Sequence, residues 1–241
     1  MSEDARRLTL GHRSRQQALR VATIRELSEV WRSTFDIDDV RGSWSRFATA
    51  ALPAIEDGRR TSATLAAEHF SQFRETAGLG PRQATRMVET DERRARRALE
   101  YSSKVSTLRA IQAGRSPQEA ARTGMVRSMG TSTRLVSEGG RDTLIQAVRD
   151  DPQARGWQRV TGGDPCEFCA MLSARGGVYS PDGADFEAHD HCACEAEPVY
   201  RTRFLDERQQ QWKELYDREA KGQRDPLKAF RAAYRAEFKA A

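Results

Sequence analysis

Cys166-Glu167-Phe168-Cys169 begins the stretch that decides how this chain folds locally. The stretch continues twenty residues later with His189-Asp190-His191-Cys192-Ala193-Cys194. The two motifs contain all four cysteines of the 241 residues and two of the four histidines. A Cys-x2-Cys pair with a second Cys/His cluster about twenty residues further on has the spacing at which proteins close a tetrahedron around Zn²⁺. The pattern therefore predicts a structural zinc site.

Other uses of these cysteines explain less of the pattern. Disulfides need an oxidising compartment, whereas the N-terminal residues include Glu3 and Asp4 and lack the apolar segment of an export signal. A thioredoxin-like dithiol at Cys166 and Cys169 leaves the other two cysteines and both histidines unexplained. Reduced thiols that bind nothing are a further alternative. Structural zinc accounts for the most residues at once.

A catalytic zinc site is the more specific rival. Pro165-Cys166-x-x-Cys169 matches the second half of the nucleobase-deaminase signature, whose first half is an upstream His-x-Glu. The histidines upstream, His12 and His69, are followed by Arg-Ser and Phe-Ser, so that half is missing. The sequence also contains no His-Glu-x-x-His and no Gly-x-Ser-x-Gly motif. A site closed by protein ligands is therefore favoured over a catalytic one.

The spacing ranks the ligands. Cys166 and Cys169 are one turn apart on a short helix that we expect to begin at Cys166 and to end at Gly176–Gly177. Side chains two apart share a face of an extended segment, which groups Cys192 with Cys194. His189 can join them if the chain turns, whereas His191 leans the other way. The predicted ligands are Cys166, Cys169, His189 and Cys194, with Cys192 and His191 as alternates.

A stretch of 45 residues, from 156 to 200, carries a recognisable set of motifs. They are Gly156-Trp-Gln-Arg159, Asp164-Pro-Cys-Glu-Phe-Cys-Ala-Met-Leu172, Arg175-Gly-Gly-Val-Tyr179, His189-Asp-His-Cys-Ala-Cys194 and Glu197-Pro-Val-Tyr200. Together they resemble the MuF-like minor capsid proteins, or phage head morphogenesis proteins, in the form found in tailed phages that infect actinobacteria. The resemblance maps His-x-x-Cys-x-Cys onto His189, Cys192 and Cys194, which ranks His189 above His191.

Charge is distributed unevenly along the chain. Residues 82–127 contain eleven basic and five acidic residues, whereas residues 161–199 contain one basic and eight acidic residues. A zinc module that grips nucleic acid needs basic residues to displace counterions from phosphates. The acidic module is therefore expected to shape a protein surface, and any DNA contact is expected from the arginine-rich region or the basic C-terminal tail. Whether those arginines are instead balanced by neighbouring acids stays open.

Apolar spacing predicts helices on both sides of the cysteine window. Residues 18–31 and 44–73 follow a period near 3.6, and Pro53 is expected to end or kink the second helix. A polar helix is predicted over 82–113; it has too few apolar residues to be buried on all sides and is expected to lie across a partner or to span between modules. The capping box Ser116-Pro117-Gln118-Glu119 predicts a helix from Pro117, with Gly139-Gly140 as a break.

After the window, one amphipathic helix is expected around Trp212, and Asp225-Pro226 should cap another with Phe230, Tyr234 and Phe238 on one face. Short strands are expected at 157–160, 177–179 and 193–200, and Pro198 marks the last as an edge strand or its end.

The predicted fold class is thus α+β, predominantly α, with long helices flanking a small zinc-bound α+β module. The segments are a helical N-terminal region (1–113), a helical connector (114–154), the small α+β zinc module (155–200) and a helical C-terminal tail (201–241). No run of 18 apolar residues occurs, so no membrane contact is expected.

The resemblance implies a structural minor capsid protein rather than an enzyme. We expect it to be made in the host cytoplasm, to lie inside the virion capsid at or near the portal vertex, and to assist head assembly and genome packaging or ejection. Its expected partners are the portal protein and the major capsid protein, with multiple copies per particle and non-specific contact with packaged DNA as an open alternative. The alternative function is a zinc-dependent enzyme acting on nucleic acid or nucleotides, suggested by Pro165-Cys-x-x-Cys and by Asp185, Glu187 and Asp190 nearby.

Overall fold

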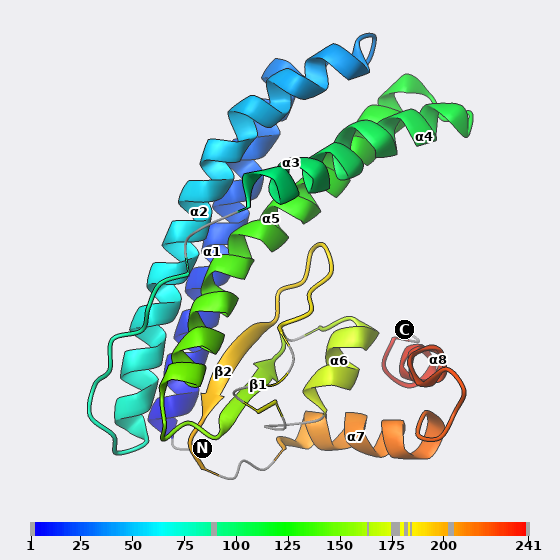
Figure 1. Ribbon diagram of the computed structural model, residues 1–241. Helices are drawn as coiled ribbons and strands as arrows, with labels where there is room; N and C mark the ends of the chain where they lie inside the picture. The colour runs from blue at the N-terminus through cyan, green and yellow to red at the C-terminus, as the bar shows by residue number, and fades with distance from the viewer. Residues whose placement is uncertain are drawn as a thin grey trace.

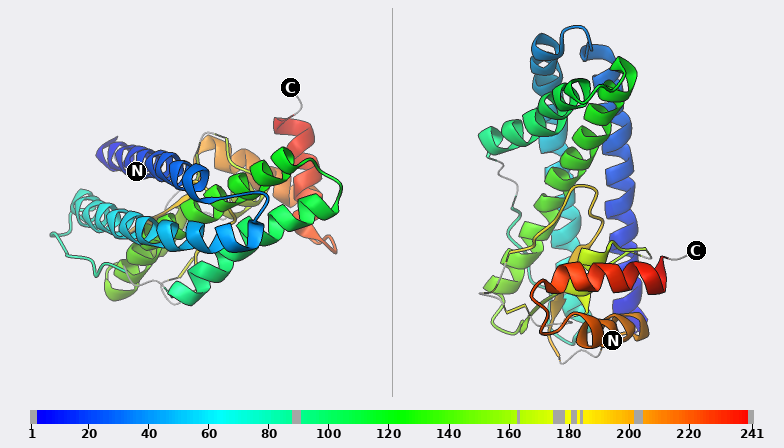
Figure 2. Two further views of the ribbon diagram at one scale, coloured as in Figure 1. Left: turned by 90° about the horizontal axis from the view of Figure 1, so that it is seen from above. Right: turned by 90° about the vertical axis from the view of Figure 1, so that its right-hand side faces the viewer.

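Three long helices form the body of the protein: α1 (Glu3–Thr34), α2 (Val40–Thr76) and α5 (Pro117–Asp150) (Figure 1). The computed structural model describes residues 3–87, 91–162, 164–174, 179–180, 183, 185–201 and 205–239. Gln16 and Thr23 of α1 lie beside Ser62 and Gly58 of α2, in reverse order along the chain, so these helices are antiparallel. The views in Figure 2 show α5 lying beside both of them.

Helix α2 continues through Pro53, so the expectation that it ends at this residue is wrong, while a kink there stays a prediction. A proline inside a helix costs about 3 kcal/mol because it removes a hydrogen bond and crowds the preceding turn. Phe47 and Ile55, on either side of it, are almost fully buried in the core of the body. Burying each such side chain contributes about 1.5–3 kcal/mol. Packing of α2 against its neighbours therefore outweighs the local preference of the proline.

Helix α5 begins at Pro117, as the sequence predicts, and the capping box is formed in both directions. The Ser116 hydroxyl accepts a hydrogen bond from the Glu119 amide, and the Glu119 carboxylate accepts one from the Ser116 amide. The expected break at Gly139-Gly140 is wrong, because the helix runs through it. A Cβ atom on Gly139 would lie 2.3 Å from the carbonyl oxygen of Arg59 in α2. These glycines therefore allow two helices to approach closely.

The polar helix predicted over 82–113 begins later, at Glu92, where the side chain of Asp91 caps it. It comprises α3 (Glu92–Glu100), one π-helical segment η1 (Tyr101–Val105) and α4 (Ser106–Gln112). The residues before it are tied to α5 instead: Arg82 donates to the carbonyl of Asp150, and the Met87 amide donates to Thr143. The helix packs on the first half of α5, so its partner is this chain itself.

The sheet has two antiparallel strands, β1 (Gly156–Val160) and β2 (Glu195–Val199). Gly156 pairs with Val199 and Val160 with Glu195, which confirms the strands predicted at 157–160 and 193–200. Pro198 is tolerated because each strand of such a sheet has a free edge. Of the strand expected at 177–179, Tyr179 forms a bridge to Trp157, and the other two residues lie outside the described ones.

A second layer lies across the sheet from the body: α6 (Glu167–Ser173), α7 (Glu207–Glu219) and α8 (Pro226–Phe238) (Figure 1). Helix α6 ends at Ser173, before the expected Gly176–Gly177, which lie outside the described residues. The Asp225 cap of α8 is confirmed. Phe230 and Tyr234 of its aromatic face are buried in a separate core with Trp212 and residues of α6. That face is therefore interior to this protein.

The helices and the small sheet confirm a fold that is α+β and predominantly α. The division into four segments stays a prediction; α5, which falls in the connector, packs along α1 and α2. Among the described residues, no helix has both the length and the apolar character that crossing a lipid bilayer would require.

Candidate metal centre

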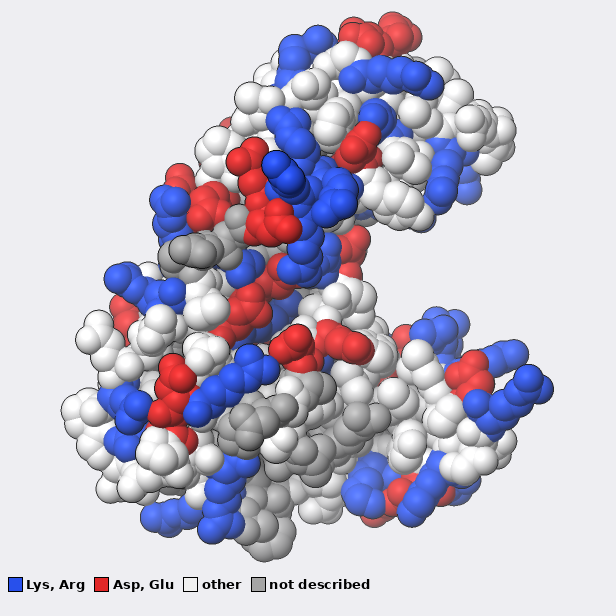
Figure 3. Space-filling model, in the orientation of Figure 1, with Lys and Arg blue, Asp and Glu red and all other residues white. Residues whose placement is uncertain are grey.

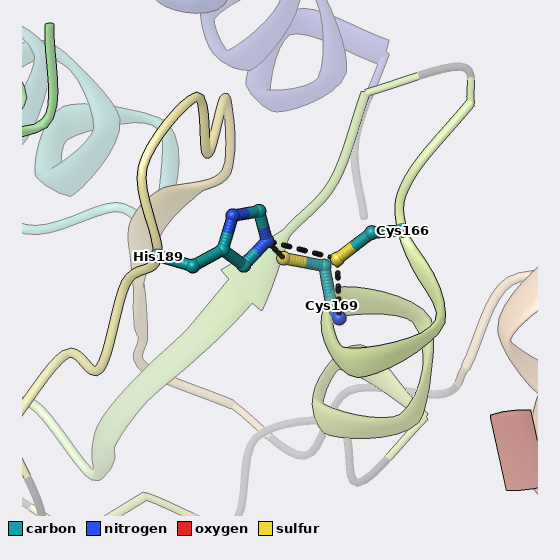
Figure 4. Close-up of side chains that lie close together, drawn as sticks. All are labelled: Cys166, Cys169 and His189. Atoms are coloured by element: carbon teal, nitrogen blue, oxygen red, sulfur yellow. Dashed lines mark hydrogen bonds between the residues drawn. The ribbon is translucent and has the colours of Figure 1, made fainter. Parts of the chain in front are cut away.

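Two loops bring five of the six candidate ligands together. Cys166 is the N-cap residue of α6, and its Sγ accepts a hydrogen bond from the Cys169 amide at 3.4 Å. The loop that leads into β2 contributes His189, Cys192 and Cys194. Figure 4 shows the His189 ring pointing at the sulfur atoms of Cys166 and Cys169.

The donor atoms form two overlapping groups that share Cys169. In the first, His189 Nε2 lies 2.9 Å from Cys166 Sγ and 3.7 Å from Cys169 Sγ. In the second, Cys169 Sγ lies 3.6 Å from Cys192 Sγ, and Cys194 Sγ is within 4.8 Å of both. Bonds of about 2.3 Å to sulfur and 2.0–2.1 Å to nitrogen place neighbouring donors of a tetrahedral zinc roughly 3.5–3.8 Å apart. Each group of three can hold a metal ion, and a fourth ligand for the first group would have to come from Cys192 or Cys194 of the second.

His191 lies outside both groups. Its φ angle of 65° is in the left-handed region, and the Cys192 amide donates to the His189 carbonyl at 3.1 Å. The resulting turn points His189 inward, while the His191 ring lies against α5, where a Cβ atom on Gly130 would be 2.4 Å from its Nε2. The alternate ligand His191 is therefore not part of the cluster.

The protonation of His189 follows from its two neighbours. Its Nδ1 lies 2.6 Å from the carbonyl oxygen of Asp190, which can only accept, so Nδ1 carries a proton and Nε2 faces the thiols. The hydrogen bond to Cys166 raises the pKa of His189 to about 9. Hydrogen bonds from Cys169 and His189 lower the pKa of the Cys166 thiol to about 4. A metal ion that binds here must displace the Nε2 proton.

Helix α5 holds the second loop in place. Asp190 accepts hydrogen bonds from Thr131 at 3.0 Å and from Arg134 at 2.9 Å. Arg141, which is 1 % exposed, donates to the carbonyl oxygens of Cys192 and Cys194 at 2.8–3.0 Å. The sequence analysis missed these residues because they belong to no motif. The signal was their spacing, which places them on one face of a single helix.

Buried polar contacts also connect strand β2, which follows the second loop, to helix α1. Arg20 pairs with Glu195 at 2.8 Å, both nearly inaccessible, and Thr9 donates to Glu197. Burial raises the pKa of Glu195, and the positive charges of Arg141 and Arg20 oppose that shift. The acidic module was expected to shape a protein surface, but these two glutamates face the interior.

The first loop is held by α8. The Tyr234 hydroxyl donates to the carbonyl of Pro165 at 3.1 Å, and α8 contributes two ion pairs, Arg235 with Glu167 and Lys239 with Asp164. The basic residues of this helix therefore neutralise acids beside the first cysteine.

The three acids considered for an enzyme have different surroundings. Asp185 pairs with Arg149 at 3.1 Å, and Asp190 is bound to α5 as described. The exposed Glu187 lines a hollow of about 490 Å³ that adjoins His189 and also contains Asp185 and Phe168. Carboxylates therefore stand beside the cluster without belonging to either donor group.

The family model described as VG15 protein matches residues 3–219. The matched region covers the three-helix body, both loops of the metal centre and α7, and it ends where α7 ends. It thus extends far beyond the 45 residues that carry the resemblance to MuF-like proteins. No curated protein and no solved structure matches the chain.

Proposed function

We propose that this chain, which belongs to the VG15 protein family, is a structural minor capsid protein of a tailed phage, located inside the head at or near the portal. Family membership indicates a phage virion protein, and the match over residues 3–219 is the observation that carries the proposal. The finer assignment, to a MuF-like protein that assists head assembly and genome packaging or ejection, is supported by the resemblance of residues 156–200.

The metal centre fits a structural role with Zn²⁺ as its ion. Thiolates with one imidazole are the donors of structural zinc sites. Cys169, Cys192 and Cys194 are each at most 3 % exposed, and the two loops that meet here are held from α5 on one side and α8 on the other. Zinc bound here joins two loops that are twenty residues apart in the sequence, so its binding free energy adds to the stability of the fold.

The portal protein and the major capsid protein are the proposed partners, with several copies of this chain per particle. The aromatic face of α8 is buried, so attachment must use another surface. Helix α1 exposes three apolar side chains, Leu10, Val21 and Ile24, at 36–51 % of their area. We favour the face of α1 at Val21 and Ile24 as the attachment surface, because these two are one turn apart and adjoining exposed apolar side chains commonly mark protein contacts.

The test is the protein content of purified particles from a phage that carries a tagged chain. We expect the protein in full heads and in portal-containing assemblies after DNA removal. A Val21→Glu change should reduce its incorporation, whereas Gln211→Glu, which adds the same charge at an exposed position of α7, should not. Absence of the chain from purified particles would contradict the proposal. Equal incorporation of both variants would exclude this face of α1 only.

A zinc-dependent enzyme acting on nucleic acid or nucleotides is the second candidate, favoured by the hollow that adjoins His189 and contains Glu187. Turnover of a nucleotide by the zinc-loaded protein, abolished by Glu187→Gln but unaffected by Glu207→Gln on α7, would support it. Absence of turnover over a panel of nucleotides and single-stranded DNA would contradict the enzyme candidate and leave the structural role as the remaining proposal.

A further inference from the structure

The positive charge of this protein is concentrated in one projecting part. Residues 92–127, which comprise α3, η1, α4 and the first third of α5, form a two-helix arm, here called the basic arm (Figure 1). It contains nine basic and three acidic residues, a net charge of +6, while the whole chain carries +5. All other residues together therefore carry −1.

Most arginines of the basic arm lack acidic partners among the described residues, although Arg94 pairs with Glu138 at 3.5 Å. Six of them are exposed and have no carboxylate oxygen within 4.0 Å in the part of the chain that the structure describes: Arg93, Arg97, Arg109, Arg115, Arg122 and Arg127. Three exposed arginines elsewhere, Arg7, Arg60 and Arg218, do have such partners. Figure 3 shows blue side chains gathered where Figure 1 places α3. The arm is therefore not a helix face balanced by its own acids.

The arm presents these charges on a stiff support. Helix α3 continues through η1 into α4 over 21 residues, a length of about 30 Å. Arg93 and Arg97 are one turn apart, and Arg109 donates to the Tyr101 hydroxyl at 2.9 Å. The helices are in close contact, since a Cβ atom on Gly124 of α5 would lie 2.1 Å from the Thr107 hydroxyl. The charges are thus carried by two helices that pack against each other.

We propose that the basic arm binds the phosphate backbone of duplex DNA, without reading its sequence. A length of about 30 Å spans roughly nine base pairs at 3.4 Å each. Guanidinium groups match phosphate oxygens in pairs, which ammonium groups do not. This inference rests on the proposed function in one respect only: the duplex DNA that the arm meets is taken to be the DNA packaged in the phage head. An acidic protein surface is the competing partner.

The experiment measures binding of the purified full-length chain to a labelled duplex of about 20 base pairs as a function of salt. Each phosphate contact contributes about −0.9 to the slope of log K against log salt, so six contacts predict a slope near −5. Affinity should then fall about 10³-fold between 50 and 200 mM salt. The triple variant Arg93→Gln, Arg97→Gln, Arg109→Gln should reduce the slope by about 3 and weaken binding at least tenfold.

A matched control distinguishes the effect of removing charge from the arm from the effect of lowering the net charge of the whole chain. Arg7→Gln, Arg60→Gln and Arg218→Gln together remove the same charge from exposed, already paired positions. This control should change the slope by less than about 1. Equal weakening in both triple variants, or no binding by the unmodified chain, would overturn the proposal, as would a preference of the arm for an acidic polypeptide over the duplex. None of these results changes whether the protein is found in particles, so the two proposals can fail separately.

Discussion

The contact between α2 and α5 at Gly139 allows one quantitative prediction. A Cβ atom at this position would lie 2.3 Å from the backbone carbonyl oxygen of Arg59, whereas ordinary contacts begin at 3.4 Å. Gly139→Ala therefore requires the two helices to separate by about 1 Å, because neither atom belongs to a flexible side chain. Overpacking of this kind costs about 1–3 kcal/mol. We expect a cost of about 3 kcal/mol here, because the clash is with backbone, which yields less than a side chain.

The same substitution also has a favourable part. Alanine is about 1 kcal/mol better than glycine inside a helix. The net effect of Gly139→Ala is therefore a loss of about 2 kcal/mol in the free energy of unfolding, or a Tm lower by about 4–8 °C for a chain of this size. Gly11→Ala on α1 is the matched control, because nothing lies within 4 Å of the added atom. It should raise the Tm by about 2–4 °C.

Thermal unfolding followed by circular dichroism, with both variants in the same metal-loaded state, gives the comparison. The Tm of Gly11→Ala is expected to be higher than that of the unmodified protein, and the Tm of Gly139→Ala lower. A Gly139→Ala protein at least as stable as the unmodified one would refute the reasoning, because helix propensity would then be the larger effect.

Three further outcomes are expected. Elemental analysis of protein purified without added metal should give about one zinc per chain; a value near zero with four freely titrating thiols would contradict this. Cys166→Ser should expose residues 155–200 to protease while α1 and α2 stay protected, since metal binding stabilises the loops; unchanged proteolysis argues against a structural site. Burial, with help from Arg15, lowers the pKa of His12 from 6.5 to about 4. The unfolded chain therefore takes up this proton first, and about 3 kcal/mol of stability present above pH 6.5 is lost as pH falls to about 4. Urea unfolding at both ends of that range should show a smaller loss for His12→Gln, and an equal loss would exclude His12 as the cause.

Much of the fold was predictable because its signals are local. The capping residues Ser116 and Asp225 act within three residues of themselves, so the starts of α5 and α8 follow from the sequence. The meeting of Cys166, Cys169 and His189 was also predictable, because thiols and imidazole at this spacing serve few other purposes. The choice between Cys192 and Cys194 stays a prediction, since both lie beside Cys169.

The burial of α1 shows where local signals fail. The apolar period over 18–31 includes Val21 and Ile24, but both are more than a third exposed, and Gln16 and Arg20 are buried instead. Arg20 is paired with Glu195 of β2, and Gln16 with Ser62 of α2. A buried polar side chain is stable when it has such a partner.

By itself, the sequence determined most of the helical segments, where several of them begin and which side chains could bind a metal, since each depends on neighbours a few residues away. Only the tertiary structure decided that α2 passes through Pro53, that α5 passes through its glycines and that Arg141 anchors the second loop. Each of these depends on a surface that lies tens of residues away in the chain. Packing and the pairing of buried polar groups act between such surfaces, and they outweigh local preferences of about 1–3 kcal/mol.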